Sequence, residues 1–570
     1  MASLSASSTF PFYNANQKRL QIPVVGRRRY LSSPRKISCK SKDRGGKEID
    51  RRDVLIGLGG LYGSTSFNVD PLALAAPLKS PDLSKCGAAD LPLGAKPINC
   101  CPPKKLKIVD FKLPSLLSSS SPMRVRQAAH LVNDEYIAKY SKAIALMKAL
   151  PADDPRSFTQ QANVHCAYCD GAYDQIGFPH LEIQVHNSWF FFPWHRYYLY
   201  FFEKICGKLI NDPTFALPFW NYDSPGGMQM PAMYANPNSP LYDKLRDPKH
   251  QPPTMVDLDY DKVDPNTIGQ EQIASNLSIM YRQVVSNAKT TQLFFGTPYR
   301  AGDEPDPGAG SVENVPHGPV HLWCGDRSQP NLEDMGNFYS AARDPIFFAH
   351  HSNIDRLWTI WKGLGGKRKD YTDPDWLNTE FLFYDENAQL VRVKVRDTLD
   401  EKKFRYTYQE VDIPWLKARP TPRKTKVKPT ADDSGGQFPR ALDSVVKTVV
   451  KRPKKSRSKK EKDDEEEILV IEGIELDRDV FVKFDVFIND EDETVSGPGN
   501  SEFAGSFVNV PHKHGKKMNM KNFKTCLRLG ITDLLEDLEA EDDETVVVTL
   551  VPRQGKDVVT IGGLKIELAS

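Results

Sequence analysis

The sequence predicts a mainly α-helical domain followed by a smaller all-β domain, sandwich-like in character. Apolar residues recur at intervals of three and four in the central part of the chain, β-branched runs split by turn residues dominate its last part, and a highly charged stretch separates the two. With 570 residues, 39% of them hydrophobic, the chain has an ordinary globular composition. A net charge of +2 gives no global attraction to nucleic acid, and no apolar run reaches the roughly 18 residues of a membrane-spanning helix.

The first 75 residues are expected to be a targeting leader rather than part of the fold. Residues 1–42 contain nine Lys and Arg but no Asp or Glu, which is typical of an organelle transit peptide. Arg51-Arg52, the apolar stretch 54–62 and small residues up to Ala75 follow in the order of a twin-arginine export signal. Together they predict import into the chloroplast and then export to the thylakoid lumen. The alternative is a basic arm with a chance arginine pair.

Three helices and one loop-rich region are predicted after the leader. Residues 77–120 lack periodicity and are rich in Pro, Ser and Cys, so we expect an extended arm held by cross-links. Apolar spacing predicts helices over 125–149, 194–209 and 346–361. Between 211 and 315, Pro, Asn, Asp and Gly are dense enough to favour long functional loops.

A breaker-rich, charged stretch over 419–467 is predicted to be a solvated linker that proteases can reach. Beyond it, β-branched and partly alternating runs at 479–487, 545–551 and 558–561 predict strands. The last domain, over 468–570, is therefore expected to be all-β.

The histidines are the candidate metal ligands. His317 and His321 are four residues apart, so on a helix they share one face and can bind one metal. His350 and His351 lie in an apolar helix, where an unpaired ring is costly to bury. Adjacent positions point about 100° apart, so at most one of these two should reach that metal, and spacing leaves open which one. Asp355, four beyond His351, is a candidate to orient a neighbouring ring.

A matching set lies in the first half of the chain: His165, His186 and His195. Nine residues put His186 and His195 half a turn out of phase, and Pro193 supports a break that leaves His186 on a loop and His195 opening the next helix. Two histidine trios without matching thiolates or carboxylates favour copper or zinc over iron or calcium. Five further histidines lack partners in the pattern and are given no role: His130, His180, His250, His512 and His514.

Two longer motifs resemble the copper signatures of tyrosinases and plant polyphenol oxidases (catechol oxidases). They span residues 186–203 and 344–355, and further marks of the plant enzymes stand at 375–377 (Asp-Trp-Leu) and 483–486 (Lys-Phe-Asp-Val). The resemblance covers essentially everything after the leader and implies a four-helix bundle within 76–418 that holds a type-3 centre of two copper ions. It assigns His165, His186 and His195 to the first copper, and His317, His321 and His351 to the second.

The cysteines agree with this resemblance. It implies disulfides Cys86–Cys101 and Cys100–Cys166, whereas the sequence by itself permits three pairings of these four residues. An oxidising lumen is consistent with them. Cys169 falls where the family forms a thioether to the second histidine, here His186; the alternative is a buried free thiol. The remaining cysteines of the mature chain have no assigned role: Cys206, Cys324 and Cys526.

The resemblance implies oxidation of o-diphenols to o-quinones with reduction of dioxygen to water, and copper changes oxidation state where zinc cannot. Phe338 matches the family's gate over the second copper, although it could equally be ordinary core packing. Glu313 matches the acid that holds a water and helps to deprotonate phenols. Gly318 and Leu322 follow the first two ligands of the second copper, and plant relatives with strong monophenol hydroxylation often have Asn at the first of these positions. We therefore expect weak or absent monophenolase activity.

The resemblance further implies that the C-terminal domain covers the copper entrance and keeps the enzyme latent until a protease cuts the linker; its alternative role is to stabilise the fold. The expected partners are dioxygen, small phenolic substrates and the processing protease, with no nucleic acid. Alternative functions are a tyrosinase with appreciable monophenol hydroxylation, a specialised polyphenol oxidase acting on flavonoid precursors such as chalcones, and an oxygen carrier without turnover. A zinc hydrolase is a further alternative.

Overall fold

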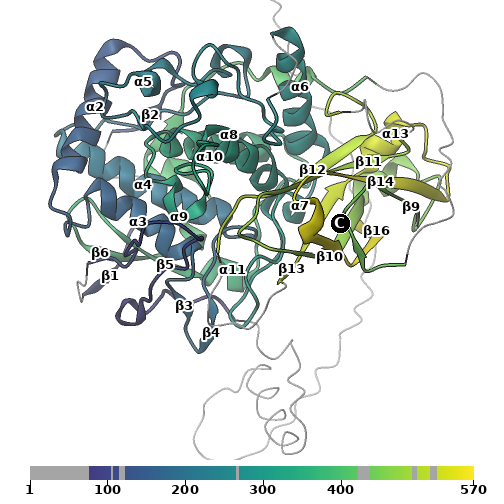
Figure 1. The fold of residues 1–570 in the computed structure, drawn as a ribbon, viewed down its shortest axis with the longest axis horizontal. Helices are drawn as coiled ribbons and strands as arrows, with labels where there is room; N and C mark the ends of the chain where they lie inside the picture. The colour runs from purple at the N-terminus through teal and green to yellow at the C-terminus, as the bar shows by residue number, and fades with distance from the viewer. Residues whose placement is uncertain are drawn as a thin grey trace, which may run out of the picture. The chain divides into compact units, whose positions relative to one another are not determined.

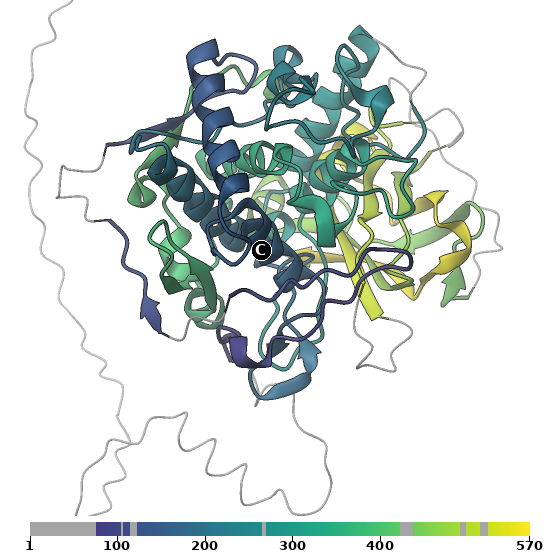
Figure 2. The same ribbon diagram turned by 60° about the vertical axis from the view of Figure 1, so that its left-hand side comes forward.

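A computed structural model describes residues 76–103, 107–114, 122–264, 269–421, 437–490, 497–513 and 523–570. The expected leader, 1–75, lies outside these residues, and so do residues 422–436 of the expected linker. Helices dominate the part before residue 421, and strands dominate the part after 437 (Figure 1). The two parts lie side by side in both views (Figure 1, Figure 2).

A group of helices forms the centre of the first part, called here the catalytic part. They are α2 (Asp134–Ala149), α3 (Phe158–Cys169), α4 (Phe191–Leu209), α8 (Gly318–Cys324) and α10 (Ile346–Gly363). Helix α4 packs against both α2 and α10. Nearly every α4 side chain is buried, as expected for a helix that is apolar on all faces. All eight tryptophans of the chain are fully buried around these helices.

Two of the three predicted helices agree closely with the structure, and the first does not. The helix expected over 125–149 begins only at Asp134, because the Asn133 side chain accepts the Tyr136 N–H and caps its N-terminus. Residues Arg124–Arg126 instead form strand β2, which pairs in parallel with β7 (Tyr406–Tyr408). Buried ion pairs from Arg124 and Arg126 to Glu203 of α4 hold this strand in place.

The region expected to be long loops, 211–315, also contains helical elements. The longest is α6 (Gln270–Tyr281), whose polar residues masked its apolar face in the sequence. Shorter ones are α5 (Ala232–Ala235), the π-helical turns η5 (Arg282–Ser286) and η6 (Glu313–His317), and α7 (Thr291–Phe295). Outside this region lie α9 (Phe338–Ala341), α11 (Pro374–Asn378), the pair β3 (Asp174–Gln175) and β4 (Phe178–Glu182), and the sheet of β1 (Ile108–Asp110), β6 (Leu390–Lys394) and β5 (Glu380–Tyr384).

Two disulfides fasten the N-terminal arm. They join Cys86 to Cys101 and Cys100 to Cys166, the pairing that the family resemblance implies. The second disulfide links the arm to α3, the helix that carries His165. Among the described residues, no helix is long and apolar enough to cross a membrane.

Two facing sheets make up the second part, called here the C-terminal part. One has the order β13–β10–β15–β8, with β16 also paired to β10, and the other has the order β12–β11–β14–β9. Apolar side chains such as Leu469 of β10 and Phe484 of β11 form the core between them, which confirms the predicted sandwich. The strands are β8 (Arg440–Ala441), β9 (Val446–Lys451), β10 (Glu466–Leu476), β11 (Val482–Ile488), β12 (Phe503–Asn509), β13 (Phe523–Gly530), β14 (Thr545–Gln554), β15 (Val559–Ile561) and β16 (Gly563–Ala569), with helices α12 (Lys459–Asp464) and α13 (Thr532–Asp537).

The structure corrects the expected linker of 419–467. Strands β8 and β9, helix α12 and the start of β10 all lie within it, so the C-terminal part begins near residue 437 rather than at 468. Some of the charged residues in this stretch form buried ion pairs instead of facing solvent: the buried Arg452 Nε lies 2.7 Å from Glu467 Oε1. Local composition could not reveal these strands, because their pairing partners lie about a hundred residues further along the chain.

Candidate metal centre

Seven buried histidines gather in two clusters. The first contains His165 on α3, His186 on the loop before α4, and His195 on α4. The loop and the helix are as predicted, but α4 begins at Phe191, before Pro193. The second contains His317 at the end of η6, His321 on α8, and both His350 and His351 on α10. Within each cluster the candidate ligand atoms lie within 4.8 Å of one another. Helices α3, α4, α8 and α10 therefore supply all the clustered histidines except His186 and His317.

Backbone carbonyls orient most of these rings through Nδ1. The Nδ1 atoms of His165 and His321 lie 2.9 and 2.8 Å from the carbonyl oxygens of Phe338 and Met335. His195 and His317 make the same contact four residues back along their own turns, to Phe191 and Glu313. Because a carbonyl can only accept, each of these Nδ1 atoms carries the proton and Nε2 keeps a free lone pair.

Most of the Nε2 atoms in the clusters have no partner among the residues that the structure describes. Those of His165, His186, His195 and His317 are buried and have no hydrogen-bond partner among the described residues. His321 Nε2 and His351 Nε2 face each other at 3.2 Å. Buried polar atoms are rarely left unsatisfied, so this arrangement fits a set of metal ligands.

Burial also keeps these imidazoles neutral. It lowers the pKa of His165 to about 3 and that of His321 to about 4, and it lowers the pKa values of the other clustered histidines well below the usual range. Neutral imidazole is the form that binds a metal. An all-imidazole donor set suits copper or zinc, and two such clusters side by side fit a pair of copper ions.

The second cluster contains one histidine more than the family resemblance assigns. The His351 ring places its Nε2 opposite that of His321, whereas the His350 ring stacks on His317 with centroids 5.4 Å apart. The position of His351 Nε2 agrees with the ligand that the resemblance assigns, but both ring nitrogens of His350 are also buried without a partner among the described residues.

Asp355 was predicted to orient a neighbouring histidine ring, but its observed contacts are with other residues. Its carboxylate instead accepts from Arg196 Nε at 2.6 Å, from Arg126 Nη1 at 3.3 Å and from the hydroxyls of Tyr406 and Tyr408. Although burial opposes it, this pairing with Arg196 and Arg126 lowers the pKa of Asp355. The ion pairs tie α10 to α4 and β2 behind the metal centre.

The side chain of Gln184 holds His186, a role that no sequence pattern indicates. Its Oε1 accepts from the backbone N–H groups of Val185 and His186 and lies 3.2 Å from His186 Nδ1. Its Nε2 donates to the Cys169 carbonyl at 3.0 Å. Cys169 itself is a buried thiol whose pKa is raised by burial. One amide group therefore links the end of α3 to the loop that carries His186.

Phe338 and Glu313 both lie beside the clusters. The buried Phe338 ring stacks on His186 with centroids 4.0 Å apart and an interplanar angle of 19°. Glu313 is buried on η6, and its Oε1 accepts the Asn187 N–H at 2.5 Å. Burial raises the pKa of Glu313 well above its usual value, so this acid retains a proton at pH values where an exposed glutamate has lost it.

Gly318 and Leu322 are buried on α8, directly after His317 and His321. A Cβ atom at Gly318 would lie 3.0 Å from Val508 Cγ1 and 3.4 Å from Val510 Cγ2, both in the C-terminal part. Val508 and Val510 of the C-terminal part thus fill the space that a side chain at position 318 would need.

His512 is a second residue to which the sequence assigned no role. Its ring stacks on Phe338 with centroids 4.8 Å apart, and its Nε2 lies 3.3 Å from Asp306 Oδ2. No signal in the sequence could have indicated this, because both partners lie more than 170 residues away. By contrast, His250 is satisfied in the core: its Nδ1 contacts the Trp323 carbonyl and its Nε2 contacts Asp264.

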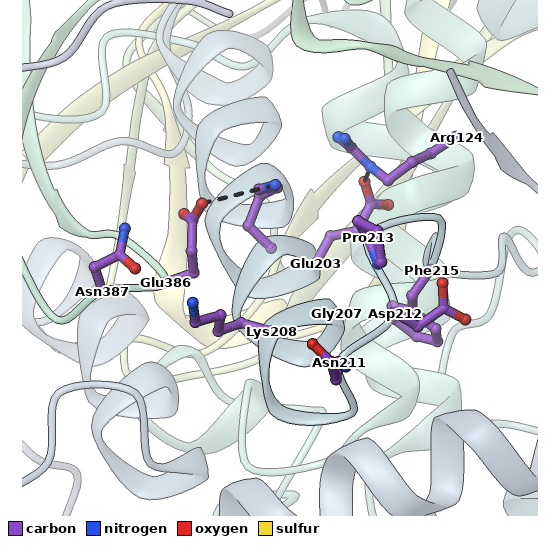
Figure 3. Close-up of a pocket in the computed structure, with 11 residues that line it drawn as sticks. Arg124, Glu203, Gly207, Lys208, Asn211, Asp212, Pro213, Phe215, Glu386 and Asn387 are labelled. Atoms are coloured by element: carbon purple, nitrogen blue, oxygen red, sulfur yellow. Dashed lines mark hydrogen bonds and ion pairs between the residues drawn. The ribbon is translucent and has the colours of Figure 1, made fainter. Parts of the chain in front are cut away.

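A cavity of about 290 Å³ lies at the C-terminal end of α4 (Figure 3). Four of its charged groups form two ion pairs: Lys204 Nζ lies 3.7 Å from Glu386 Oε1, and Arg124 Nε lies 2.8 Å from Glu203 Oε1. None of the clustered histidines lines it. Its lining residues are Arg124, Glu203, Lys204, Gly207, Lys208, Asn211, Asp212, Pro213, Phe215, Glu386 and Asn387.

Three family models match the chain in succession. Residues 155–364 match the common central domain of tyrosinase, 370–421 the polyphenol oxidase middle domain, and 438–568 the chloroplastic polyphenol oxidase C-terminal domain. The last match starts where the structure places the first strands of the C-terminal part.

Known proteins are similar over nearly the whole chain. A chloroplastic polyphenol oxidase of Malus domestica is 62% identical over 99% of this chain and 97% of its own length. Aureusidin synthase of Antirrhinum majus is 60% identical over 89% of this chain and 92% of its own. Among solved structures, latent apple tyrosinase is 66% identical and superimposes with a TM-score of 0.77, covering 81% of this chain and all of that one. The chloroplastic names of relatives support a chloroplast location.

A helical domain with two buried histidine clusters, a β sandwich against it and these matches agree with one another. The chain belongs to the plant polyphenol oxidases, copper-dependent oxidoreductases of the tyrosinase family.

Proposed function

We propose that this enzyme is a catechol oxidase that converts o-diphenols to o-quinones and reduces dioxygen to water. The observation that carries the proposal is the pair of buried histidine clusters, in which four of the six Nε2 atoms have no hydrogen-bond partner among the described residues and the other two, of His321 and His351, face each other at 3.2 Å. His165, His186 and His195 would hold one copper, and His317, His321 and His351 the other. When bound, the two coppers supply the electron transfer between phenol and dioxygen.

The surrounding residues suit a flat phenolic substrate. Phe338 lies against His186 and offers an aromatic face that bounds the space over the histidines. Glu313, whose pKa burial raises, is placed to exchange a proton with a phenolic hydroxyl through a water molecule. Oxygen uptake on catechol together with copper analysis tests the proposal: we expect two coppers per chain and rapid uptake. A single metal ion per fully loaded chain, or no uptake on catechol, would overturn it.

Weak monophenolase activity is the second element of the proposal. Gly318 and Leu322 carry no polar group that could help to orient or deprotonate a monophenol. Initial rates on dopamine and tyramine, which differ by one ring hydroxyl, provide the comparison. We expect dopamine to be strongly preferred, and equal efficiency on the two substrates would contradict this element.

Latency is supported by the contacts of the C-terminal part. Val508 and Val510 pack against Gly318, and the Phe338 N–H donates to the Pro511 carbonyl at 3.3 Å. Residues 508–512 thereby lie against two elements that flank the histidines. A protease acting between the two parts would be needed to uncover the site.

An engineered protease site within residues 422–436 allows a clean test of latency. We expect catechol oxidation to rise once the chain has been cut and the C-terminal part has been separated, with copper content unchanged. The control is the unmodified chain treated with the same protease. An unchanged rate after complete cleavage and separation of the two parts would show that the C-terminal part does not shield the site.

A thioether between Cys169 and His186, and delivery to the thylakoid lumen, complete the proposal. The Gln184 amide already holds both residues of the expected cross-link. Peptide mass mapping should find the linked peptides lighter by two hydrogens, with Cys169 protected from alkylation. Fractionation of chloroplasts should recover the mature chain with lumenal proteins.

A further inference from the structure

Among the residues that the structure describes, no strand lies beside one edge of the C-terminal sandwich. Strand β12 is the terminal strand of its sheet and, within the described part of the chain, pairs with β11 alone. Its residues alternate in direction, so the backbone groups of Ala504, Ser506 and Val508 face away from β11. Exposed edges of this kind normally attract another strand.

Side chains of the catalytic part satisfy this edge in place of a strand. Asn314 Nδ2 donates to the Ser506 carbonyl, and Asn314 Oδ1 accepts the Val508 N–H at 2.9 Å. One amide group thus imitates the donor and the acceptor of a neighbouring strand residue. Asn314 belongs to η6, one residue after Glu313.

Two further residues extend the row. Asn287 Nδ2 donates to the Ala504 carbonyl at 2.7 Å, and Arg282 Nη2 donates to the Ser501 carbonyl at 2.9 Å. All three side chains are at least nine-tenths buried, and they come from the two π-helical turns η5 and η6 or directly follow them. We call Arg282, Asn287 and Asn314 the strand-reading row.

The row recognises a peptide backbone more than particular side chains. Each of its hydrogen bonds ends on a main-chain atom, so the contact depends on an extended conformation. The segment that occupies it also has a small-residue stretch, Ala504-Gly505-Ser506, in which a Cβ atom at Gly505 would lie 3.4 Å from Asn287 Nδ2. Recognition by main-chain hydrogen bonds with limited side-chain selection is the mode of strand-addition peptide sites.

We propose that the strand-reading row is a peptide-binding site, and that residues 501–512, presented in trans as a separate extended peptide, bind it once the two parts have been cut apart. The proposal rests on the proposed removal of the C-terminal part. A bound peptide would place its residues 508–512 against Gly318 and Phe338, as the intact chain does, and would inhibit catechol oxidation. The freed enzyme would therefore be open to control by extended peptides.

The binding test uses a fluorescently labelled synthetic peptide of residues 500–512 and the full-length holoenzyme that has been cut within 422–436 and separated from its C-terminal part. Fluorescence anisotropy should show saturable binding to the cut enzyme and at least tenfold weaker binding to the uncut enzyme, whose row is occupied. Size-exclusion chromatography should show that excess peptide displaces any C-terminal part still attached.

Two N-methylated peptides form the matched control. Methylation at Val508 removes the N–H that Asn314 accepts, whereas methylation at Phe507 modifies an N–H that faces away from the row. We expect at least tenfold weaker binding for the first and little change for the second. Equal binding of both, or no binding of the unmodified peptide, would overturn the proposal.

The enzyme variant Asn314→Leu gives the complementary result, with at least tenfold weaker peptide binding expected. Catechol oxidation by the same cut sample, measured without peptide, separates this proposal from the proposed function. A cut enzyme that binds peptide but fails to oxidise catechol would refute the function alone. A cut enzyme that oxidises catechol but does not bind the peptide would refute only the proposal that the strand-reading row is a peptide-binding site.

Discussion

At the scale of single residues, the metal centre depends on which nitrogen of each imidazole makes a hydrogen bond to the protein, because the other nitrogen is then free to bind a metal. Four of the six proposed ligands donate Nδ1–H to a backbone carbonyl, which no substitution can easily remove. His186 differs, because its Nδ1 contacts a side chain, Gln184 Oε1, at 3.2 Å. This makes His186 the ligand whose orientation a single substitution can release.

Gln184→Leu is expected to weaken the first copper site. Loss of the amide frees the His186 ring and its link to Cys169, and removing such a supporting hydrogen bond typically lowers metal affinity roughly 10- to 100-fold. Dialysis against a chelator, followed by copper analysis, should leave less copper than in the parent enzyme. The thioether yield from peptide mapping should fall as well.

Gln175→Leu is the matched control for Gln184. Gln175 is equally buried, and its amide bonds Tyr299 Oη and the Gly302 N–H without touching a clustered histidine. If both variants lose copper to the same extent, the effect of Gln184 is general destabilisation and the positioning role is wrong.

At the scale of elements, the contact between α8 and β12 depends on one missing side chain. Gly318 opens α8, and Val508 of β12 occupies the space that a Cβ atom would need. Helix α8 and strand β12 are therefore packed without a gap, so a change in side-chain size on one of them displaces the other.

Gly318→Ala is expected to raise the catechol oxidation of the uncut chain several-fold. The added methyl would lie 3.0 Å from Val508 Cγ1, so the strand has to move outward. Adding Val508→Ala to the same chain removes the opposing methyl groups and should restore low activity. Gly363→Ala, where a Cβ atom meets nothing within 4 Å, is the control. An unchanged rate in the uncut Gly318→Ala chain would show that this contact does not limit access.

Elements that depend on local pattern were predictable, and those that depend on distant partners were not. The helices over 191–209 and 346–363 are apolar enough to be recognised from spacing alone. The strands within 437–467 were mistaken for linker because their charges are balanced by remote groups, as Arg452 is by Glu467. In the metal centre, spacing and apolar surroundings indicated the clustered histidines, and only the family resemblance chose His351 over His350. Gln184 and His512 act through contacts that no spacing rule describes.

At the scale of the whole molecule, buried charges join the catalytic and C-terminal parts. Asp306 is buried with Arg478 and His512 of the C-terminal part, and these two partners lower its pKa although burial opposes them. Lys483 of β11 lies 3.0 Å from Asp259, whose pKa burial raises to about 7. As the pH rises, the contribution of Asp306 to docking therefore increases, whereas that of Asp259 decreases.

The pH dependence of docking follows from these directions. A carboxylate with a lowered pKa stabilises the docked state above its usual pKa of about 4, and this contribution is lost as the pH falls through the lowered value. Asp306 should therefore hold the cut C-terminal part at neutral pH and release it in acid. Asp259, with a raised pKa, favours docking most below about pH 4 and progressively less up to about pH 7.

Asp306→Asn is expected to release the cut C-terminal part already at neutral pH. The change leaves Arg478 without its carboxylate, and breaking a buried ion pair typically costs about 3–5 kcal/mol. Retention after cleavage can be followed by size-exclusion chromatography between pH 3 and pH 8. Asp303→Asn, in the same loop but bonded to Arg300, should behave like the parent. The role of Asp306 would be contradicted if the cut Asp306→Asn enzyme retained its C-terminal part at neutral pH and released it at the same acidic pH as the parent.

The position of β12 at the rim of its sheet has a consequence for the fate of the shed fragment. In the intact chain, amides and a guanidinium cover this rim; after release, its main-chain donors and acceptors would meet only water. Uncovered rims of this kind template fibril growth and swapping between molecules. The discarded sandwich should accordingly be short-lived, lost to precipitation or digestion, which would make activation a one-way step.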